Sequence, residues 1–136
     1  MQTWQQKYQT RTRPLVKVAE HDYGDVKTGT KVLISTPAEV EAELRNIPEG
    51  TEITLRELRA RLARKHFAQT ASPIVTSTCL HIVAENALDQ MDLGLPIYKA
   101  APFWRVIQPW TPLARKLSCG LAGLVVLRMR EGLPVQ

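Results

Sequence analysis

The stretch TPAEVEAELRNIPEGTEITLRELRARLARKH, residues 36–66, decides the fold because it contains two complete helix signals in succession. The first begins at Thr36, a capping residue followed by Pro37 at the first helical position. Glu39, three residues after the cap, is placed to bond back to the Thr36 amide. The apolar residues that follow at near-helical spacing are Val40, Leu44 and Ile47. Residues 48–50, Pro-Glu-Gly, end this helix.

The second signal is a capping box, Thr54 to Glu57, which opens a helix that we expect to run to about His66. Its leucines fall on an inward face at helical spacing, and its arginines fall largely outward. The basic residues of this helix are Arg56, Arg59, Arg61, Arg64 and Lys65. Residues 36–52 carry five acids and one base, whereas residues 53–66 carry five bases and one acid. The positive charge is therefore concentrated on one predicted helix.

Two further helices are predicted on the C-terminal side of this stretch. Ser72, followed by Pro73, opens a helix to about Met91, and its wide apolar face indicates that it is mostly buried. Residues 94–107 are expected to form a loop followed by a strand. A last helix is expected over residues 118–130, where Gly132 ends it.

On the N-terminal side, residues 1–34 show no sustained periodicity. The two short strands expected there are Leu15–Ala19 and Val32–Ile34. We interpret residues 1–34 as an N-terminal extension and residues 35–136 as the domain. This order of elements predicts a small α+β fold that is mostly helical. The helices at 54–66 and 72–91 are joined by about five residues and form a candidate helix-turn-helix.

Length and composition limit the class of protein. The chain has 136 residues, of which 44% are hydrophobic, and a formal net charge of +5. These values are typical of one globular domain and permit an anionic partner. After Lys116, the uncharged run Leu117–Leu127 is eleven residues, too short to span a membrane, and the N-terminus lacks the apolar region of a secretory signal. Two cysteines without a CxxC motif indicate a reducing, cytoplasmic setting, with no metal or cofactor.

Several short strings occur in the order found in one known family. They are Ile47-Pro48-Glu49-Gly50, Ile53-Thr54, the helix start Ser72-Pro73, the string PFWRVI at 102–107, and Glu131-Gly132. Over roughly residues 33–132 the chain resembles the C-terminal domain of the O6-alkylguanine-DNA alkyltransferases. It is most similar to a bacterial alkyltransferase-like branch that lacks the active-site cysteine. The resemblance implies a winged-helix-like, helix-turn-helix domain that binds double-stranded DNA.

The chain departs from this family at the residues that carry its chemistry. The position of the nucleophilic cysteine is occupied by Phe103, and the following histidine by Trp104. A phenyl ring cannot accept an alkyl group, since nucleophilic catalysis needs an activated heteroatom. The nucleotide-flipping tyrosine falls at Leu55, and residues 67–98 contain no arginine to fill the gap left by a flipped base. We therefore expect no alkyl transfer and no enzymatic activity.

The resemblance also implies where DNA would lie. The five basic residues of the 54–66 helix would contact the phosphate backbone, and Arg105 would add a further contact. The start of the next helix would dock in the minor groove through small polar side chains, for which Ser72, Thr76 and Ser77 are available. The former active-site pocket would consist of Leu55, Phe103, Trp104 and Glu131. Such a protein would recognise alkylated DNA for repair without transferring the alkyl group.

The sequence alone leaves several alternative interpretations of these residues open. The basic helix is equally typical of a solvated amphipathic face, and the aromatic pair at 103–104 either stacks a base or plugs the old cleft. The main alternative function is a protein-interaction module, or a homo-oligomer, that docks through residues 1–34 or the apolar last helix. An enzyme that uses Cys119, which follows two cationic residues, is a third hypothesis. His66 and His81 are interpreted as structural or surface residues.

Overall fold

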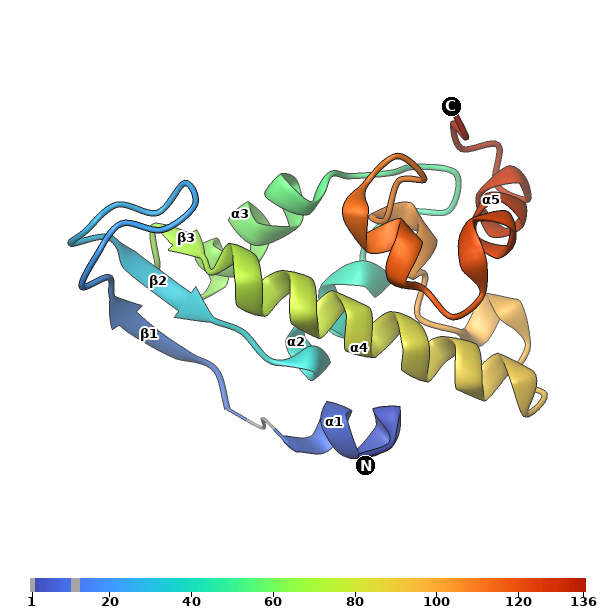
Figure 1. Ribbon diagram of the computed structural model, residues 1–136, viewed down its shortest axis with the longest axis horizontal. Helices are drawn as coiled ribbons and strands as arrows, with labels where there is room; N and C mark the ends of the chain where they lie inside the picture. The colour runs from blue at the N-terminus through green and yellow to red at the C-terminus, as the bar shows by residue number, and fades with distance from the viewer. Residues whose placement is uncertain (1, 11–12) are drawn as a thin grey trace.

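The computed structural model describes residues 2–10 and 13–136 and has an α+β architecture that is about 51% helical (Figure 1). The described α-helices are α1 (Trp4–Thr10), α2 (Pro37–Arg45), α3 (Leu55–Lys65), α4 (Pro73–Asp92) and α5 (Gly120–Met129). The strands are β1 (Leu15–Val18), β2 (Lys31–Ile34) and β3 (Thr70–Ala71). Three short 3-10 helices lie in the C-terminal half: η1 (Ile97–Lys99), η2 (Phe103–Arg105) and η3 (Pro112–Lys116).

The sheet has the order β1-β2-β3 and lies at one end of the molecule. β1 pairs antiparallel with β2, with Leu15 opposite Ile34, and β2 pairs parallel with β3, with Val32 opposite Thr70. The two strands predicted before residue 35 are confirmed. The two-residue β3 and the helix α1 are not predicted, because the first is too short to show a period and the second has no buried residue.

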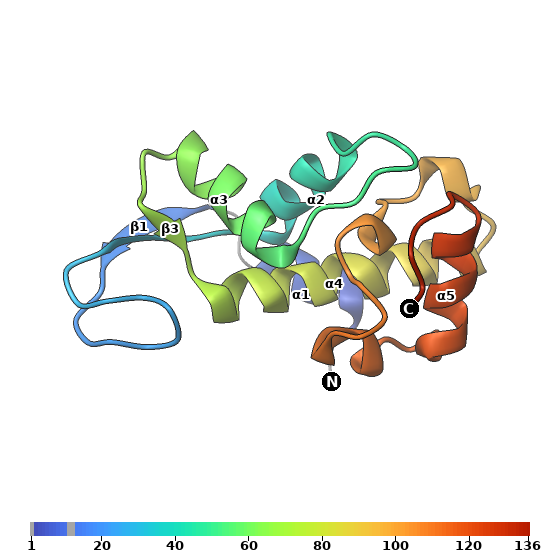
Figure 2. The same ribbon diagram turned by 90° about the horizontal axis from the view of Figure 1, so that it is seen from above.

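α4 is the central helix of the fold and crosses most of the molecule (Figure 2). It packs against α1, α2, α3 and η2, and its buried side chains include Cys79, Val83 and Ala87. The prediction of a long, mostly buried helix opened by Ser72 is therefore confirmed. Its first turn departs from the predicted apolar face, since Ile74 is 67% exposed.

The predicted caps form, with one difference. Thr54 and Glu57 make the reciprocal capping box that opens α3, and the Thr36 hydroxyl accepts a hydrogen bond from the Glu39 amide at 3.2 Å. The Glu39 carboxylate does not bond back to the Thr36 amide as expected. It instead lies 2.8 Å from Nε2 of His66 at the end of α3, so that it ties two helices together.

The strand predicted within residues 94–107 is wrong. The described chain forms η1 and η2 there, because Pro96 and Pro102 each lack the amide hydrogen that a central strand would need. Phe103 and Trp104 are buried in the main core, which is built from α2, α3, α4 and the segment 100–107. The last helix is confirmed, starting two residues later than expected. None of the described helices combines the length and the apolar character needed to cross a membrane.

Candidate functional site

The outward face of α3 carries the accessible cations of this helix. Arg56 and Arg64 are exposed and Arg61 is half-buried. Within residues 2–10 and 13–136, none of these three guanidinium groups has an ion-pair partner. At the 3.6-residue period of an α-helix the three positions fall on one side of α3. The structure therefore brings together three of the five basic residues predicted for the DNA backbone.

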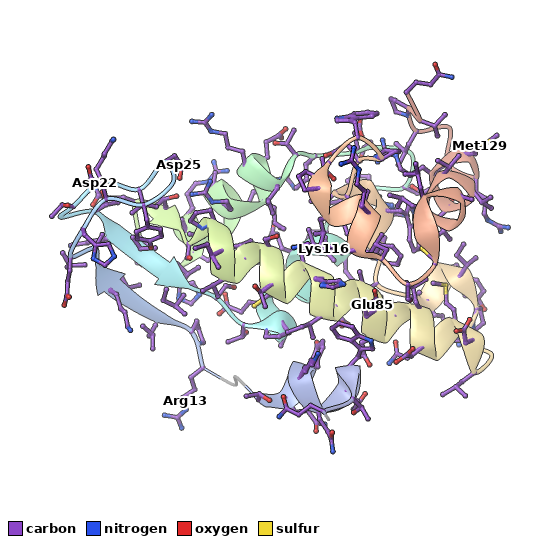
Figure 3. All side chains as sticks on the ribbon, in the orientation of Figure 1. Arg13, Asp22, Asp25, Glu85, Lys116 and Met129 are labelled. Carbon is purple, nitrogen blue, oxygen red and sulfur yellow. The ribbon has the colours of Figure 1, made fainter. Side chains whose placement is uncertain are left out.

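Arg59 does not belong to this surface, and its prediction as an outward contact is wrong. It is 7% exposed, and its guanidinium makes two hydrogen bonds to Asp25, at 2.9 and 2.7 Å. Asp25 lies in the loop between β1 and β2 (Figure 3), and the Arg59 hydrogen bond lowers the pKa of that carboxyl. The Nε atom of Arg59 also donates to the Ala71 carbonyl at 2.9 Å. Arg59 thus fastens α3 to β3 and to the hairpin loop.

Lys65 is partly neutralised in the same way. Its Nζ atom lies 2.6 Å from a carboxylate oxygen of Glu43, a buried residue of α2. The lysine side chain stays 47% exposed, so it reaches solvent while its charge is compensated. The acidic stretch that precedes α3 in the sequence therefore neutralises one of its five cations, whereas the hairpin loop neutralises another.

At the start of α4, the structure turns two of the three predicted groove residues inward. Ser72 is 3% exposed and its hydroxyl accepts a hydrogen bond from the Val75 amide at 3.3 Å, as an N-cap does. Thr76 is wholly buried, and Ser77 is half-buried. The exposed side chains of this turn are Ile74 and Thr78. The minor-groove assignment of Ser72 and Thr76 is therefore wrong, because helix capping and core packing use them.

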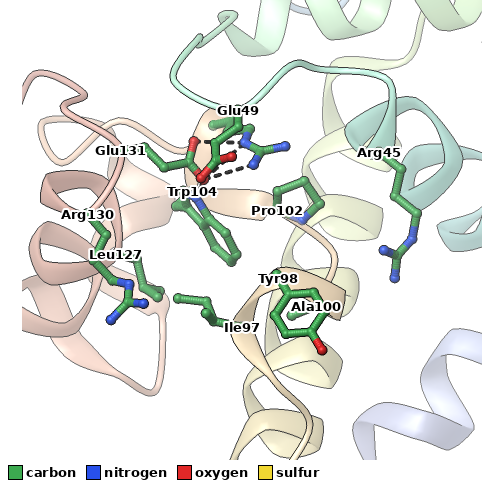
Figure 4. A pocket seen from close by; sticks show the side chains of 11 residues that line it. Arg45, Glu49, Ile97, Tyr98, Ala100, Pro102, Trp104, Leu127, Arg130 and Glu131 are labelled. Carbon is green, nitrogen blue, oxygen red and sulfur yellow. Dashed lines mark hydrogen bonds and ion pairs between the residues drawn. The ribbon is translucent and has the colours of Figure 1, made fainter.

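The predicted former active-site residues separate into two groups. Trp104 and Glu131 line a pocket of about 380 Å³, and the indole N–H of Trp104 donates to the Glu131 carboxylate at 2.7 Å (Figure 4). Phe103 is wholly buried and packs edge-on against Trp104, with ring centroids 5.3 Å apart. Leu55 is half-buried against the core and does not line this pocket. Phe103 therefore fills the protein interior.

Arg105, which the sequence predicts as a further DNA contact, lies in the pocket wall and is mostly buried. Its guanidinium donates to Glu131 at 2.9 Å and to the Ile47 carbonyl at 2.8 Å, and its side chain is 14% exposed. Glu131 also accepts from the Gly50 amide at 2.9 Å. Burial raises the pKa of Glu131, but the hydrogen bonds from Arg105, Gly50 and Trp104 outweigh it and leave the pKa below its ordinary value.

The pocket is open and is lined by charged and apolar side chains in similar measure. The walls include Ile97, Trp104 and Leu127, and the rim includes Arg45 and Arg130 on opposite sides (Figure 4). Arg45 is held by Glu41 at 3.1 Å, whereas Arg130 makes no ion pair with a described residue. The sequence did not predict Ile97, Arg45 or Arg130 here, because three separate segments supply them.

Both cysteines and two of the histidines, His66 and His81, contact neighbouring groups of the fold. Burial raises the pKa of the Cys119 thiol, the reverse of what a nucleophile requires. The Cys79 sulfur lies 3.7 Å from the Ser35 carbonyl within the core. His66 bonds to Glu39, and His81 lies 3.3 Å from Glu85. Among the residues that the structure describes, no group of three could hold a metal ion.

Comparison with known proteins gives no further guide to the site. No protein-family model, no curated protein and no solved structure matches the chain. The candidate sites of this chain are the surface of α3, the start of α4 and the pocket at Trp104.

Proposed function

We propose that the protein is a non-catalytic, alkyltransferase-like DNA-binding protein that recognises alkylated duplexes for repair without transferring the alkyl group. The observation that carries the proposal is the set of three arginines on the outer face of α3 that lack ion pairs within the described chain: Arg56, Arg61 and Arg64. In this proposal α3 and α4 act as a helix-turn-helix of winged-helix type, with α3 on the phosphate backbone and the start of α4 at the minor groove.

The charge balance around α3 supports this arrangement. Asp25 and Glu43 form ion pairs with Arg59 and Lys65, and neither forms one with the outer arginines, although the nearby charge of Arg56 also lowers the pKa of Asp25. Three cations left on one face give a surface that an anionic polymer can neutralise by releasing its counterions. Guanidinium groups suit this role because their forked N–H donors match phosphate oxygens.

The absence of alkyl transfer follows from the residues at the proposed centre. Phe103 is wholly buried and has no side-chain heteroatom. The only side-chain donor of Trp104, its indole N–H, is hydrogen-bonded to Glu131. Burial and the nearby charge of Glu85 raise the pKa of the Cys119 thiol, which disfavours the thiolate.

Fluorescence anisotropy with plain and O6-alkylguanine duplexes at two salt concentrations tests the proposal. For three phosphate contacts, log K should fall with log salt at a slope of about −2.7, which is about fortyfold between 50 and 200 mM salt. Arg61→Ala with Arg64→Ala should lower affinity and remove about 1.8 from the slope. Tighter binding of the alkylated duplex would support lesion recognition.

The matched control is Lys17→Ala with Lys99→Ala, which removes the same charge from β1 and η1, away from α3. This variant should bind with a slope close to that of the wild type. Absent binding, or binding that salt does not weaken, would overturn the proposal. Equal losses in both double variants would show a general charge effect in place of a surface on α3.

One observation favours the alternative, a protein-interaction module. α5 exposes Leu121, Val126 and Met129, and Met129 points outward in Figure 3. Residues of α1 are already used within the fold, since Tyr8 donates to Glu41 at 3.0 Å and Trp4 packs on His81. Light scattering distinguishes the two functions: a dimer that Val126→Lys dissociates would favour the alternative.

A further inference from the structure

Phe67, between α3 and β3, is exposed in a way that the fold does not explain. Its side chain is 93% exposed, more than any other large hydrophobic residue described. Its φ angle is +55°, and no other non-glycine residue in the described ranges has a positive φ. Both features oppose a phenylalanine at this position, because the left-handed region favours glycine and an exposed ring gains nothing from burial.

The backbone around Phe67 is held firmly. The Ala68 amide donates to the Ala63 carbonyl at 3.0 Å, and the Phe67 amide donates to the Arg64 carbonyl at 3.4 Å, which closes the end of α3. Immediately afterwards the Gln69 amide donates to the Lys31 carbonyl at 2.9 Å. The ring therefore projects from a fixed turn between a helix end and a strand.

This turn lies at the cationic end of α3. Arg64, whose carbonyl accepts the Phe67 amide, is one of the three outer arginines, and Arg61 lies one turn earlier. A polyanion bound along α3 would thus reach the exposed ring.

We propose that Phe67 is a wedge that stacks against a base or enters a base step of duplex DNA held on α3. The inference rests on the proposed function, since it needs DNA to lie along the outer arginines. Proteins that bind the minor groove insert apolar side chains such as Phe and Ile between base pairs, which unstacks and bends the duplex. Flexible or mismatched steps unstack most easily, so they are the preferred substrate class of this site.

The test uses the full chain, a duplex with a single mismatch beside 2-aminopurine, and the variant Phe67→Gly. Glycine removes the ring and suits the left-handed backbone, so this variant should unfold at the same or a higher temperature. Its affinity for the mismatched duplex should fall about tenfold while the salt slope stays unchanged. The wild type should raise 2-aminopurine fluorescence, whereas Phe67→Gly should leave it low, and Phe67→Trp should restore the signal.

The matched control is Leu93→Ala, which removes an 89% exposed side chain after the far end of α4. It should leave DNA affinity unchanged. If the wild type binds DNA with the expected salt slope but Phe67→Gly binds equally well, the wedge is refuted and the proposed function stands. If the wild type binds no duplex at all, both proposals fall.

Discussion

α3 and α5 place their charged residues on opposite sides, α3 mostly toward solvent and α5 toward the protein interior. α3 has its leucines inside and three arginines outside, whereas α5 exposes Leu121, Val126 and Met129 and carries its one charged residue, Arg128, inside. Arg128 is wholly buried, and its guanidinium donates to the carbonyls of Trp104 and Pro134 and to the Glu52 carboxylate. The outer arginines of α3 are accessible to a partner, whereas Arg128 of α5 is bonded to other residues of the fold.

The net charge of +5 therefore does not tell how many cationic side chains are accessible to a ligand. Arg59, Arg105 and Arg128 are all internal connectors, and each joins segments that lie far apart in sequence. They contribute as much to the net charge as Arg61 and Arg64 do, yet each guanidinium is already bonded within the fold. Substitutions of the internal arginines should lower stability, whereas substitutions of the outer arginines of α3 should lower DNA binding.

The largest loss of stability is expected for Arg128→Met. The substitution removes the Arg128 donor from Glu52 and from two backbone carbonyls, and breaking an ion pair whose cation is fully buried costs about 3 kcal/mol of unfolding free energy or more. Urea unfolding of this variant measures the loss. The control is Arg130→Met, two residues away and exposed, which should change stability by less than about 0.5 kcal/mol. Equal effects would contradict an internal role for Arg128.

A smaller loss, about 2–3 kcal/mol, is expected for Glu131→Gln, because charged hydrogen bonds from Arg105 and Trp104 become neutral or are lost. The pKa of Glu131 is lowered in the folded protein, so its contribution is present above the ordinary carboxylate pKa and is lost as pH falls through the folded value. Wild-type stability should therefore fall more steeply below about pH 4 than that of the variant. Parallel pH profiles would contradict this assignment.

The features that can be predicted from the sequence are those that depend on residues close together in the chain. The caps at Thr36 and Thr54 and the helix opened by Ser72 depend on residues within one or two turns, and these predictions are confirmed except for the bond from Glu39 back to the Thr36 amide. The inward turn of Arg59 depends on Asp25, 34 residues away, and no local pattern contains that information. α5 is similar: its helical signal is local, but the burial of Arg128 depends on Glu52 and Pro134.

The same contrast between local and long-range information applies to the candidate site. The family resemblance predicts a pocket of Leu55, Phe103, Trp104 and Glu131, with Arg105 as a DNA contact. The structure instead joins Trp104, Arg105 and Glu131 in one hydrogen-bonded cluster. Phe103 was placed in the same pocket, yet its ring points into the core. Adjacent residues in a 3-10 turn face different directions, so the string alone could not assign one ring to the pocket and the other to the interior.

The smallest loss of stability, about 1–2 kcal/mol, is expected for Arg59→Ala, and it tests the comparison within α3 itself. Arg59 is buried, but its partner Asp25 is 46% exposed at the side chain, so solvent screening weakens the pair. Arg61→Ala should lie within about 0.5 kcal/mol of the wild type in the same unfolding experiment. In DNA titrations the order should reverse, with Arg61→Ala weakening binding more than Arg59→Ala. If Arg59→Ala lowered affinity without lowering stability, the division of α3 into an internal and an external set of arginines would fail.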